Sequence, residues 1–237
     1  MTSTEFDRVA DLPQLARHSP ALLFGHADAD GHLATEQTRR NLKRAGVKVS
    51  QVVISPETAS FRFWTDYFPR VDFVKHGLVV TVDLAFSFKN PRESLSAVVK
   101  TVRSNPSTQF IILDHHPLLN PNQMPANLRL VSVDRVYDCC LGIATDDFMA
   151  VASICDGGVI VSSGRARESH MKRAVGLRRA AAEKQLNGDP LLRLLRQKKW
   201  SFFEALADEP AEYHRTVRGR RSSRGFASPL LQAALSS

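Results

Sequence analysis

Cysteine is scarce in this sequence, and signals for a membrane or for secretion are missing from it. The 237 residues include three cysteines, of which Cys139 and Cys140 are adjacent. Such a set makes neither a disulfide framework nor the CxxC spacing of a structural zinc site, which favours a reducing compartment. No apolar run approaches the roughly 18 residues that span a bilayer, and the first residues lack the basic and apolar regions of a secretion signal. We expect a soluble, cytoplasmic protein that makes no membrane contact.

Acidic residues are in deficit, but only in the last third of the chain. Lys and Arg number 32 against 24 Asp and Glu, a formal net charge of +8. Residues 1–163 hold 16 basic and 17 acidic side chains, whereas residues 164–237 hold 16 basic and 7 acidic ones. A positive surplus favours anionic partners such as nucleic acid, nucleotides or phosphate. With 43% hydrophobic and 24% charged residues, the composition excludes a disordered tail protein.

Short apolar runs alternate with amphipathic stretches before residue 164, as in parallel strands joined by helical crossovers. Residues 78–84 (LVVTVDL) and 109–113 (QFIIL) are apolar without alternation, which is typical of strands covered on both faces. The predicted fold is α/β, with a doubly wound, mainly parallel sheet of about five strands and a basic helical C-terminal extension. The expected strands are 21–25, 47–54, 78–84, 109–113 and 128–133, and the expected helices before the extension are 33–44, 90–102 and 146–155.

The sequence becomes basic and helical after residue 164. Residues 169–186 are rich in helix formers, and residues 191–206 carry an apolar stripe. We expect an α/β domain at 1–163, a basic helical extension at 164–214 and a mobile basic tail at 215–237. Trp200, Phe202 and Phe203 in the stripe are expected to pack on the core, with stacking on bases as the alternative.

Side chains that can bind metal follow three of the predicted strands and one predicted helix. They are His26, Asp28 and Asp30 after the first strand, Asp83 at the third, Asp114, His115 and His116 after the fourth, and Asp156 after the helix at 146–155. Doubly wound sheets bind ligands outside the carboxyl ends of their strands, so we expect these side chains to meet in one crevice. Carboxylate and imidazole ligands suit Mn²⁺ or Mg²⁺. So many carboxylates in one place favour two cations about 3.5–4 Å apart.

The motifs His26-x-Asp28-x-Asp30-Gly31, Asp83, Asp114-His115-His116 and Asp156 resemble, in this order, those of the DHH phosphoesterases, the RecJ-like and nanoRNase-like superfamily. The resemblance covers residues 20–160 and implies a Mn²⁺-dependent hydrolase of phosphate esters, exonucleases among them, in which two metals activate a water. Many members continue into a second domain with a GGGH-like stretch that grips the substrate. That stretch is not recognisable in this sequence, so the choice of substrate stays open.

The resemblance also implies roles for the individual residues. Asp28 and Asp30 each bind a different metal, Asp83 bridges the two, and His115 and Asp156 complete the second site. His26 ligates or supports the first metal. Asp83, Asp114 and His116 are the expected catalytic residues, with His116 facing the substrate phosphate and Asp114 orienting the histidines beside it.

Several assignments stay open at this point. The last metal ligand could come from Asp134, Asp138, Asp146 or Asp147; we prefer Asp156 because it ends an apolar segment and precedes two glycines. His32 could also reach the substrate phosphate, although a solvated helix start is favoured. Cys155 is expected to be a small buried apolar residue. A basic set in the first helix is expected to form a solvated face, with nucleic-acid contact as the second possibility: Arg39, Arg40, Lys43 and Arg44.

The predicted function is hydrolysis of phosphodiester or phosphomonoester bonds in short oligonucleotides or single-stranded nucleic acid, because the basic last third could follow a polyanionic backbone. The alternative substrates are small nucleotides, such as a cyclic dinucleotide or a nucleoside 3′,5′-bisphosphate. A possibility of another class is a non-catalytic nucleic-acid-binding scaffold. The sequence is compatible with an oligomer and sets no oligomeric state.

Overall fold

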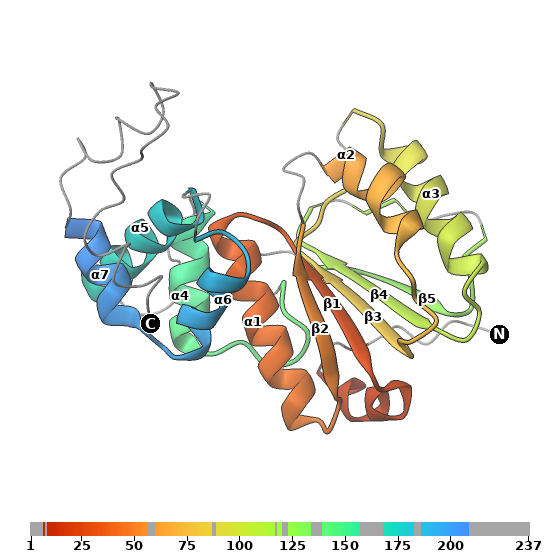
Figure 1. Ribbon diagram of the computed structural model, residues 1–237, viewed down its shortest axis with the longest axis horizontal. Helices are drawn as coiled ribbons and strands as arrows, with labels where there is room; N and C mark the ends of the chain where they lie inside the picture. The colour runs from red at the N-terminus through yellow and green to blue at the C-terminus, as the bar shows by residue number, and fades with distance from the viewer. Residues whose placement is uncertain are drawn as a thin grey trace.

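The computed structural model describes residues 7, 9–55, 60–86, 89–116, 118–119, 123–133, 139–156, 168–182 and 186–208. Five strands form one sheet in the spatial order β2-β1-β3-β4-β5 (Figure 1). They are β1 (Ala21–Gly25), β2 (Val49–Ile54), β3 (Leu78–Val82), β4 (Gln109–Asp114) and β5 (Leu128–Ser132). All neighbouring strands in this sheet are parallel, so the predicted α/β fold class is confirmed.

Side chains along β1 alternate between two buried clusters, one on each face of the sheet. Ala21 and Leu23 belong to the first cluster, and Leu22 and Phe24 belong to the second. Helices α1 (Ala29–Arg44) and α4 (Asp146–Cys155) contribute to the first cluster, and α3 (Pro91–Arg103) contributes to the second. Figure 1 shows α1 and α3 on opposite faces of the sheet. Because both faces are covered, the strands appear in the sequence as continuous apolar runs.

Helix α1 begins four residues earlier than its apolar pattern predicts, at Ala29 instead of residue 33. Asp28 precedes the helix in an extended conformation, and its side chain accepts a hydrogen bond from the Gly31 N–H at 3.0 Å. An N-cap of this kind satisfies one of the unpaired donors of the first turn. The early start places Asp30 on the first turn of the helix, at the carboxyl edge of the sheet.

The second face of the sheet is covered by an aromatic segment for which the sequence pattern predicts no element. It comprises α2 (Ser60–Arg62), the π-helical η2 (Phe63–Tyr67) and the 3₁₀-helical η3 (Phe68–Arg70). Phe63 and Trp64 are fully buried, and their ring centroids lie 4.8 Å apart. Trp64 Nε1 also donates to the Ala85 carbonyl at 2.9 Å. This hydrogen bond anchors the chain two residues after Asp83.

The C-terminal part contains α5 (Glu168–Ala182), α6 (Asp189–Arg196) and α7 (Trp200–Asp208), which lie beside α1 and α4 (Figure 1). The apolar stripe at 191–206 is therefore two helices, separated by a turn in which Lys198 has a φ of 52°. Leu177, Leu191 and Phe203 belong to the same buried cluster as residues of β1, β3 and α1. The helices after residue 164 thus complete one core with the α/β part. Residues 209–237, which include the predicted tail at 215–237, lie outside the described residues.

None of the helices in the described ranges is long and apolar enough to cross a membrane. A seven-residue 3₁₀ helix, η1 (Leu12–His18), precedes the sheet, and of its side chains Leu15 is buried.

Gly176 lies on α5 where this helix packs against α7, and it has no room for a larger side chain. A Cβ at this position would overlap the backbone carbonyl of Phe203, which cannot rotate away. In most helices Gly→Ala is stabilising by up to about 1 kcal/mol. Here we expect Gly176→Ala to lower the free energy of unfolding by about 1–3 kcal/mol, because the two helices must separate. Urea denaturation measures this change.

A matched control for Gly176→Ala is Met171→Ala on the same helix, because the Met171 side chain is 47% exposed. The control should change the free energy of unfolding by no more than about 0.5 kcal/mol. Wild-type stability of Gly176→Ala would show that α5 and α7 do not approach each other as closely as described.

Candidate metal centre

Four of the predicted site residues lie at the carboxyl ends of three neighbouring strands. His26 and Asp28 follow β1, Asp83 follows β3, and Asp114 is the last residue of β4. The chain passes from β1 outward to β2 and then returns to place β3 on the other side of β1. The crevice at such a reversal is where open α/β sheets bind their ligands.

Eight predicted site residues form three groups, and within each group the ligand atoms lie within 4.8 Å of one another. The groups are His26, Asp28 and Asp83; Asp30, His115 and Asp156; and Asp83, Asp114, His115 and His116. Asp83 and His115 each belong to two groups, and His115 Nε2 lies 3.2 Å from Asp83 Oδ1. All of the metal ligands that the sequence predicts are therefore brought together, and Asp28 and Asp30 fall in different groups.

The two carboxylate oxygens of Asp28 have different partners. Oδ1 accepts the N-capping hydrogen bond from Gly31, and Oδ2 lies 2.7 Å from His26 Nδ1. Gly31 also permits the tight turn between these residues, because a Cβ there would lie 2.6 Å from His26 Cβ and from the His26 carbonyl oxygen. The glycine of the first motif is thus required by close packing, and it holds the His26 and Asp28 side chains at the carboxyl end of β1.

Asp83 has a backbone conformation that favours glycine, with a φ of 57°. The left-handed region costs most residues about 1–2 kcal/mol, although aspartate tolerates it better than others. The Asp83 N–H donates to the Leu113 carbonyl at 3.0 Å, which ties the turn to β4. Asp83 Oδ2 is buried and has no hydrogen-bond partner among the described residues. Backbone strain and an unpartnered buried oxygen at one residue are typical of a functional position.

Asp114 holds His116 by both its backbone and its ring. Asp114 Oδ1 accepts from the His116 N–H and from His116 Nδ1, each at 2.7 Å. A carboxylate can only accept, so His116 Nδ1 carries a proton. The hydrogen bond and the charge of Asp114 raise the pKa of His116 in spite of its partial burial. The Asp114 side chain is fully buried and that of His116 is 36% exposed, so Asp114 orients His116 from behind.

Negative charge accumulates in the centre. Burial, followed by the charges of Asp30, Asp28 and Asp114, raises the pKa of Asp83 well above its ordinary value. Burial and the charge of Asp28 raise the pKa of Asp30 to about 6. Burial would lower the pKa of His26, but the hydrogen bond and the charge of Asp28 raise it to about 9. Carboxylates that repel one another in this way are stabilised by a bound cation.

The donor set of the centre fits divalent metal ions. It consists of carboxylate oxygens and imidazole nitrogens, which suit Mn²⁺ and Mg²⁺. Within the described part of the chain, the buried oxygens Asp83 Oδ2 and Asp114 Oδ2 lack hydrogen-bond partners. A cation would supply the missing partner for such an oxygen, at the point where the ligand groups meet.

Asp156 lies directly after the last residue of α4 and joins Asp30 and His115 in one ligand group. Asp147 lies in the first turn of the same helix, about 14 Å away along its axis. Its Oδ1 is 3.2 Å from Arg173 Nη1 and 3.1 Å from His170 Nε2. Asp147 therefore belongs to a different network. Three further carboxylates that the sequence offers for this position, Asp134, Asp138 and the side chain of Asp146, lie outside the described residues.

His32 does not form the solvated helix start that the sequence favours, because the ring is fully buried. Its Nδ1 donates to the Asp28 carbonyl at 2.6 Å, and its Nε2 accepts from the Gly188 N–H at 3.0 Å. Burial lowers the pKa of His32 to about 4, in agreement with a neutral ring that donates once and accepts once. With both nitrogens engaged, the ring is not placed to contact a substrate phosphate. The solvated helix start predicted at His32 is wrong because the C-terminal part covers this side of α1.

Asn187 and Gly188 hold the loop between β1 and α1 from the C-terminal part of the chain. Asn187 Nδ2 donates to the Ala27 carbonyl at 2.8 Å, and the Gly188 N–H donates to His32. The loop that carries His26 and Asp28 is thus bonded on both sides of Asp28. Sequence reasoning missed Asn187 because it lies 160 residues from Ala27, and an Asn-Gly pair signals only a turn.

The basic residues of α1 divide into two pairs. Arg39 and Arg40 bind the buried carboxylate of Glu36, at 2.7 and 2.9 Å, so they are not the solvated side chains that the sequence predicts. Lys43 and Arg44 are exposed, as predicted. The two pairs differ because Arg39 and Arg40 form ion pairs with a buried carboxylate. The spacing of charged residues along a helix does not reveal which of them are buried in this way.

The remaining residues of interest have structural positions. Phe202 and Phe203 pack against the first buried cluster, as predicted. Cys155 is 7% exposed, and its Sγ lies 3.9 Å from the Ala174 carbonyl oxygen, which confirms a small buried residue. Trp200 contacts the same cluster and also lines a pocket beside α1.

No family model and no curated protein matches the sequence. Solved structures do match the fold. One is exonuclease RecJ bound to manganese, with a TM-score of 0.47, 18% identity, and coverage of 87% of this chain and 65% of that protein. Another is RecJ in complex with Mn²⁺ from Thermus thermophilus, with a TM-score of 0.42, 17% identity, and coverage of 86% of this chain and 36% of that protein.

The chain resembles RecJ in fold. The chain spans less than two thirds of the length of either RecJ structure, 65% of one and 36% of the other. The likeness is distant, so the case for a function depends on the side chains of this chain.

Proposed function

We propose that this chain is a metal-dependent hydrolase of phosphate esters that holds two divalent cations, with Mn²⁺ favoured and Mg²⁺ as the alternative. The observation that carries the proposal is that Asp83 and His115 are each shared between neighbouring ligand groups. Two-metal sites for phosphate chemistry place their ions about 3.5–4 Å apart, so their ligand sets must share side chains. Structural zinc sites often use thiolates, and no cysteine belongs to the ligand groups that the described residues form.

Each cation has its own ligands in this proposal. Asp28 and His26 bind the first, while Asp30, His115 and Asp156 bind the second. Asp83, which is grouped with His26 and Asp28 and also with His115, would be shared between the two cations. When bound, the cations would supply a hydroxide near neutral pH and would offset the negative charge of the phosphate ester.

Side chains of the centre also act on the substrate directly. His116 is held by Asp114 with its Nδ1 protonated, and its side chain is the more exposed of the two. Its role is to donate to a phosphoryl oxygen and to stabilise the charge that develops there as the leaving group departs. Asp114 keeps the ring in this orientation. Asp83 positions His115 through their contact at 3.2 Å.

The substrate class that we infer is a short oligonucleotide or single-stranded nucleic acid. Residues 164–237 hold 16 basic and 7 acidic side chains, a surplus that suits a polyanion. In this part of the chain Asn187 and Gly188 lie just before α6. They donate hydrogen bonds to the Ala27 carbonyl and to His32, which lie on either side of the proposed ligand Asp28. The basic C-terminal part therefore contacts the segment that carries the proposed ligand Asp28.

An assay with Mn²⁺ on a panel of substrates tests the proposal. The panel contains short oligonucleotides, a cyclic dinucleotide, a nucleoside 3′,5′-bisphosphate and pyrophosphate. We expect hydrolysis of the oligonucleotides that is lost in EDTA and restored by Mn²⁺, with a KM that rises with salt concentration. Hydrolysis of only the small nucleotides would overturn the inferred substrate class. Absence of both hydrolysis and micromolar Mn²⁺ binding would overturn the enzyme and leave a scaffold of the same fold.

A further inference from the structure

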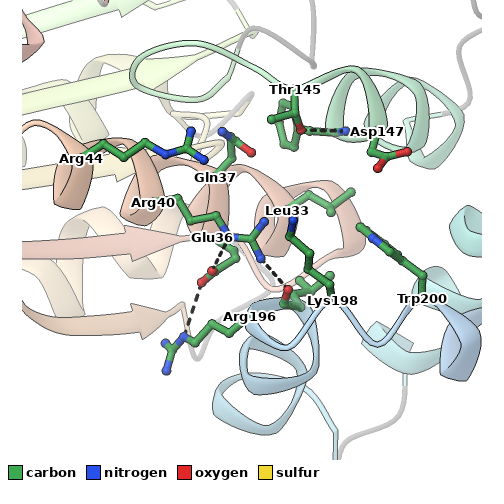
Figure 2. A pocket seen from close by; sticks show the side chains of 12 residues that line it. Leu33, Glu36, Gln37, Arg40, Arg44, Thr145, Asp147, Arg196, Lys198 and Trp200 are labelled. Carbon is green, nitrogen blue, oxygen red and sulfur yellow. Dashed lines mark hydrogen bonds and ion pairs between the residues drawn. The ribbon is translucent and has the colours of Figure 1, made fainter.

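A pocket with a volume of about 370 Å³ opens beside α1, between the start of α4 and the turn from α6 to α7 (Figure 2). Its lining residues on α1 extend from Leu33 to Arg44. Arg40 lies ten residues beyond Asp30, which is about 15 Å along the helix. The cations that α1 contributes to the pocket therefore lie well away from the metal centre, and the volume of the pocket is within the range of about 300–1,000 Å³ that is usual for small-molecule sites.

Cations outnumber carboxylates in the lining of this pocket. Its charged residues are Arg40, Arg44, Arg196 and Lys198 against Glu36 and Asp147. Both carboxylates already have partners: Glu36 binds three arginines and Asp147 binds Arg173 and His170. Among the residues that the structure describes, no carboxylate lies within 4.0 Å of the charged nitrogens of Arg44 or Lys198. The uncompensated charge suits an anionic ligand.

Lys198 is held at the pocket by a backbone conformation that lysine rarely adopts. Its φ is 52°, in the region where glycine usually ends a helix. The turn is closed by hydrogen bonds from the Lys198 N–H to the Leu195 carbonyl at 3.1 Å and from the Trp200 N–H to the Lys198 carbonyl at 2.7 Å. A glycine would adopt this turn without strain but would leave the pocket without this charge. Strain retained at an exposed residue points to a use for its side chain.

Trp200 adds a flat aromatic surface to the same pocket. The Arg173 guanidinium lies 5.3 Å from its ring centroid, and the indole is half-buried. Figure 2 shows the indole extending between Lys198 and Asp147 toward the space beside Leu33. An aromatic ring next to unpaired cations is a combination that binds a nucleobase together with its phosphate.

We propose that this pocket is a second, non-catalytic site that binds a nucleoside phosphate, either free or as the terminal nucleotide of a strand. Arg44 and Lys198 bind the phosphate, and Trp200 contacts the base. Arg40 is held by Glu36 and by the Leu195 carbonyl, at 2.9 and 2.6 Å, and keeps the wall of the pocket in place.

Binding in EDTA tests this site independently of the proposed hydrolysis, because no divalent cation is present and the carboxylates of the metal centre repel phosphate. The probes are AMP, inorganic phosphate and a 5′-phosphorylated deoxythymidine hexamer labelled at its 3′ end, on the full chain at low salt. We expect AMP or the hexamer to bind more tightly than inorganic phosphate. Arg44→Gln and Lys198→Gly should each weaken that binding by about tenfold, the effect of losing one charged hydrogen bond.

The control variants are Lys43→Gln and Lys199→Gln. Both residues are exposed, are next in sequence to Arg44 and Lys198, and do not line the pocket. Each should change the affinity by less than about threefold, since a surface charge away from a ligand contributes little. Lys198→Gly should leave the Tm unchanged or raised, so a loss of binding could not be attributed to unfolding. Equal binding by all four variants, or no probe binding better than phosphate, would overturn the proposal. AMP binding as tightly as the hexamer indicates a free nucleotide, and hexamer binding alone indicates a strand end.

Discussion

Asp83→Asn should abolish metal-dependent hydrolysis and at the same time raise the Tm of the metal-free protein. Asparagine tolerates the left-handed φ of 57° as well as aspartate does, and it fills the same space. It removes a carboxylate that is buried among Asp30, Asp28 and Asp114, whose charges raise the pKa of Asp83. Removing this repulsion should stabilise the fold by about 1–2 kcal/mol, or about 2–8 °C in Tm for a chain of this size.

Adding Mn²⁺ should reverse the order of the two proteins. The wild type gains about 2.7 kcal/mol when the metal is at a hundred times its Kd, whereas the variant has lost the carboxylate that joins His26 and Asp28 to the group containing His115. Thermal denaturation in EDTA and in Mn²⁺, together with an activity assay, measures both effects. Asp66→Asn on the exposed surface serves as the control, with unchanged Tm and activity. Hydrolysis by Asp83→Asn at near the wild-type rate would contradict the shared position of Asp83.

His32→Ala should cost about 3–5 kcal/mol in the free energy of unfolding and weaken Mn²⁺ binding. The substitution leaves a cavity where a fully buried ring stood, and it leaves the Asp28 carbonyl and the Gly188 N–H without their partners. Since Asp28 is a proposed ligand, the loop should lose its geometry as well as its stability. Urea denaturation and Mn²⁺ titration by calorimetry measure the two effects.

Conservative variants separate positioning by His32 from a simple packing role. Asparagine can reproduce the donor at Nδ1 and glutamine the acceptor at Nε2, so each should recover part of the Mn²⁺ affinity that alanine loses. His76→Ala is the control, because His76 is half-buried and its Nδ1 lies 3.2 Å from Ser50 Oγ, away from the metal loop. Wild-type Mn²⁺ affinity in His32→Ala would show that the ring does not position the loop.

The sheet and most of the centre could be predicted because both depend on local patterns. Apolar runs such as residues 78–82 and 109–113 signal strands covered on both faces, and polar residues just after parallel strands must meet at one edge. Asp83 and Asp114 are predictable for this reason.

Other features could not be predicted because they depend on contacts between distant segments. The sequence around His32 resembles an exposed first turn, and its burial depends on Gly188, 156 residues away. In the sequence, Arg39 and Arg40 resemble a solvated pair. In the structure they bind Glu36, which is buried between α1 and α6. The π-helical turn at Phe63–Tyr67 follows neither a helical nor a strand period.

The shared core described above has a consequence for how the molecule unfolds. Leu177 and Leu191 of the C-terminal helices lie in the same buried cluster as Leu23 and Val80 of the sheet. Opening the C-terminal helices would therefore expose apolar surface on α1 and break the hydrogen bonds to the Ala27 loop in the same event. Cooperative units of this kind open as a whole. The C-terminal helices and the loop that carries His26 and Asp28 are thus expected to unfold together, so a loss of order far along the chain would also displace these two candidate ligands.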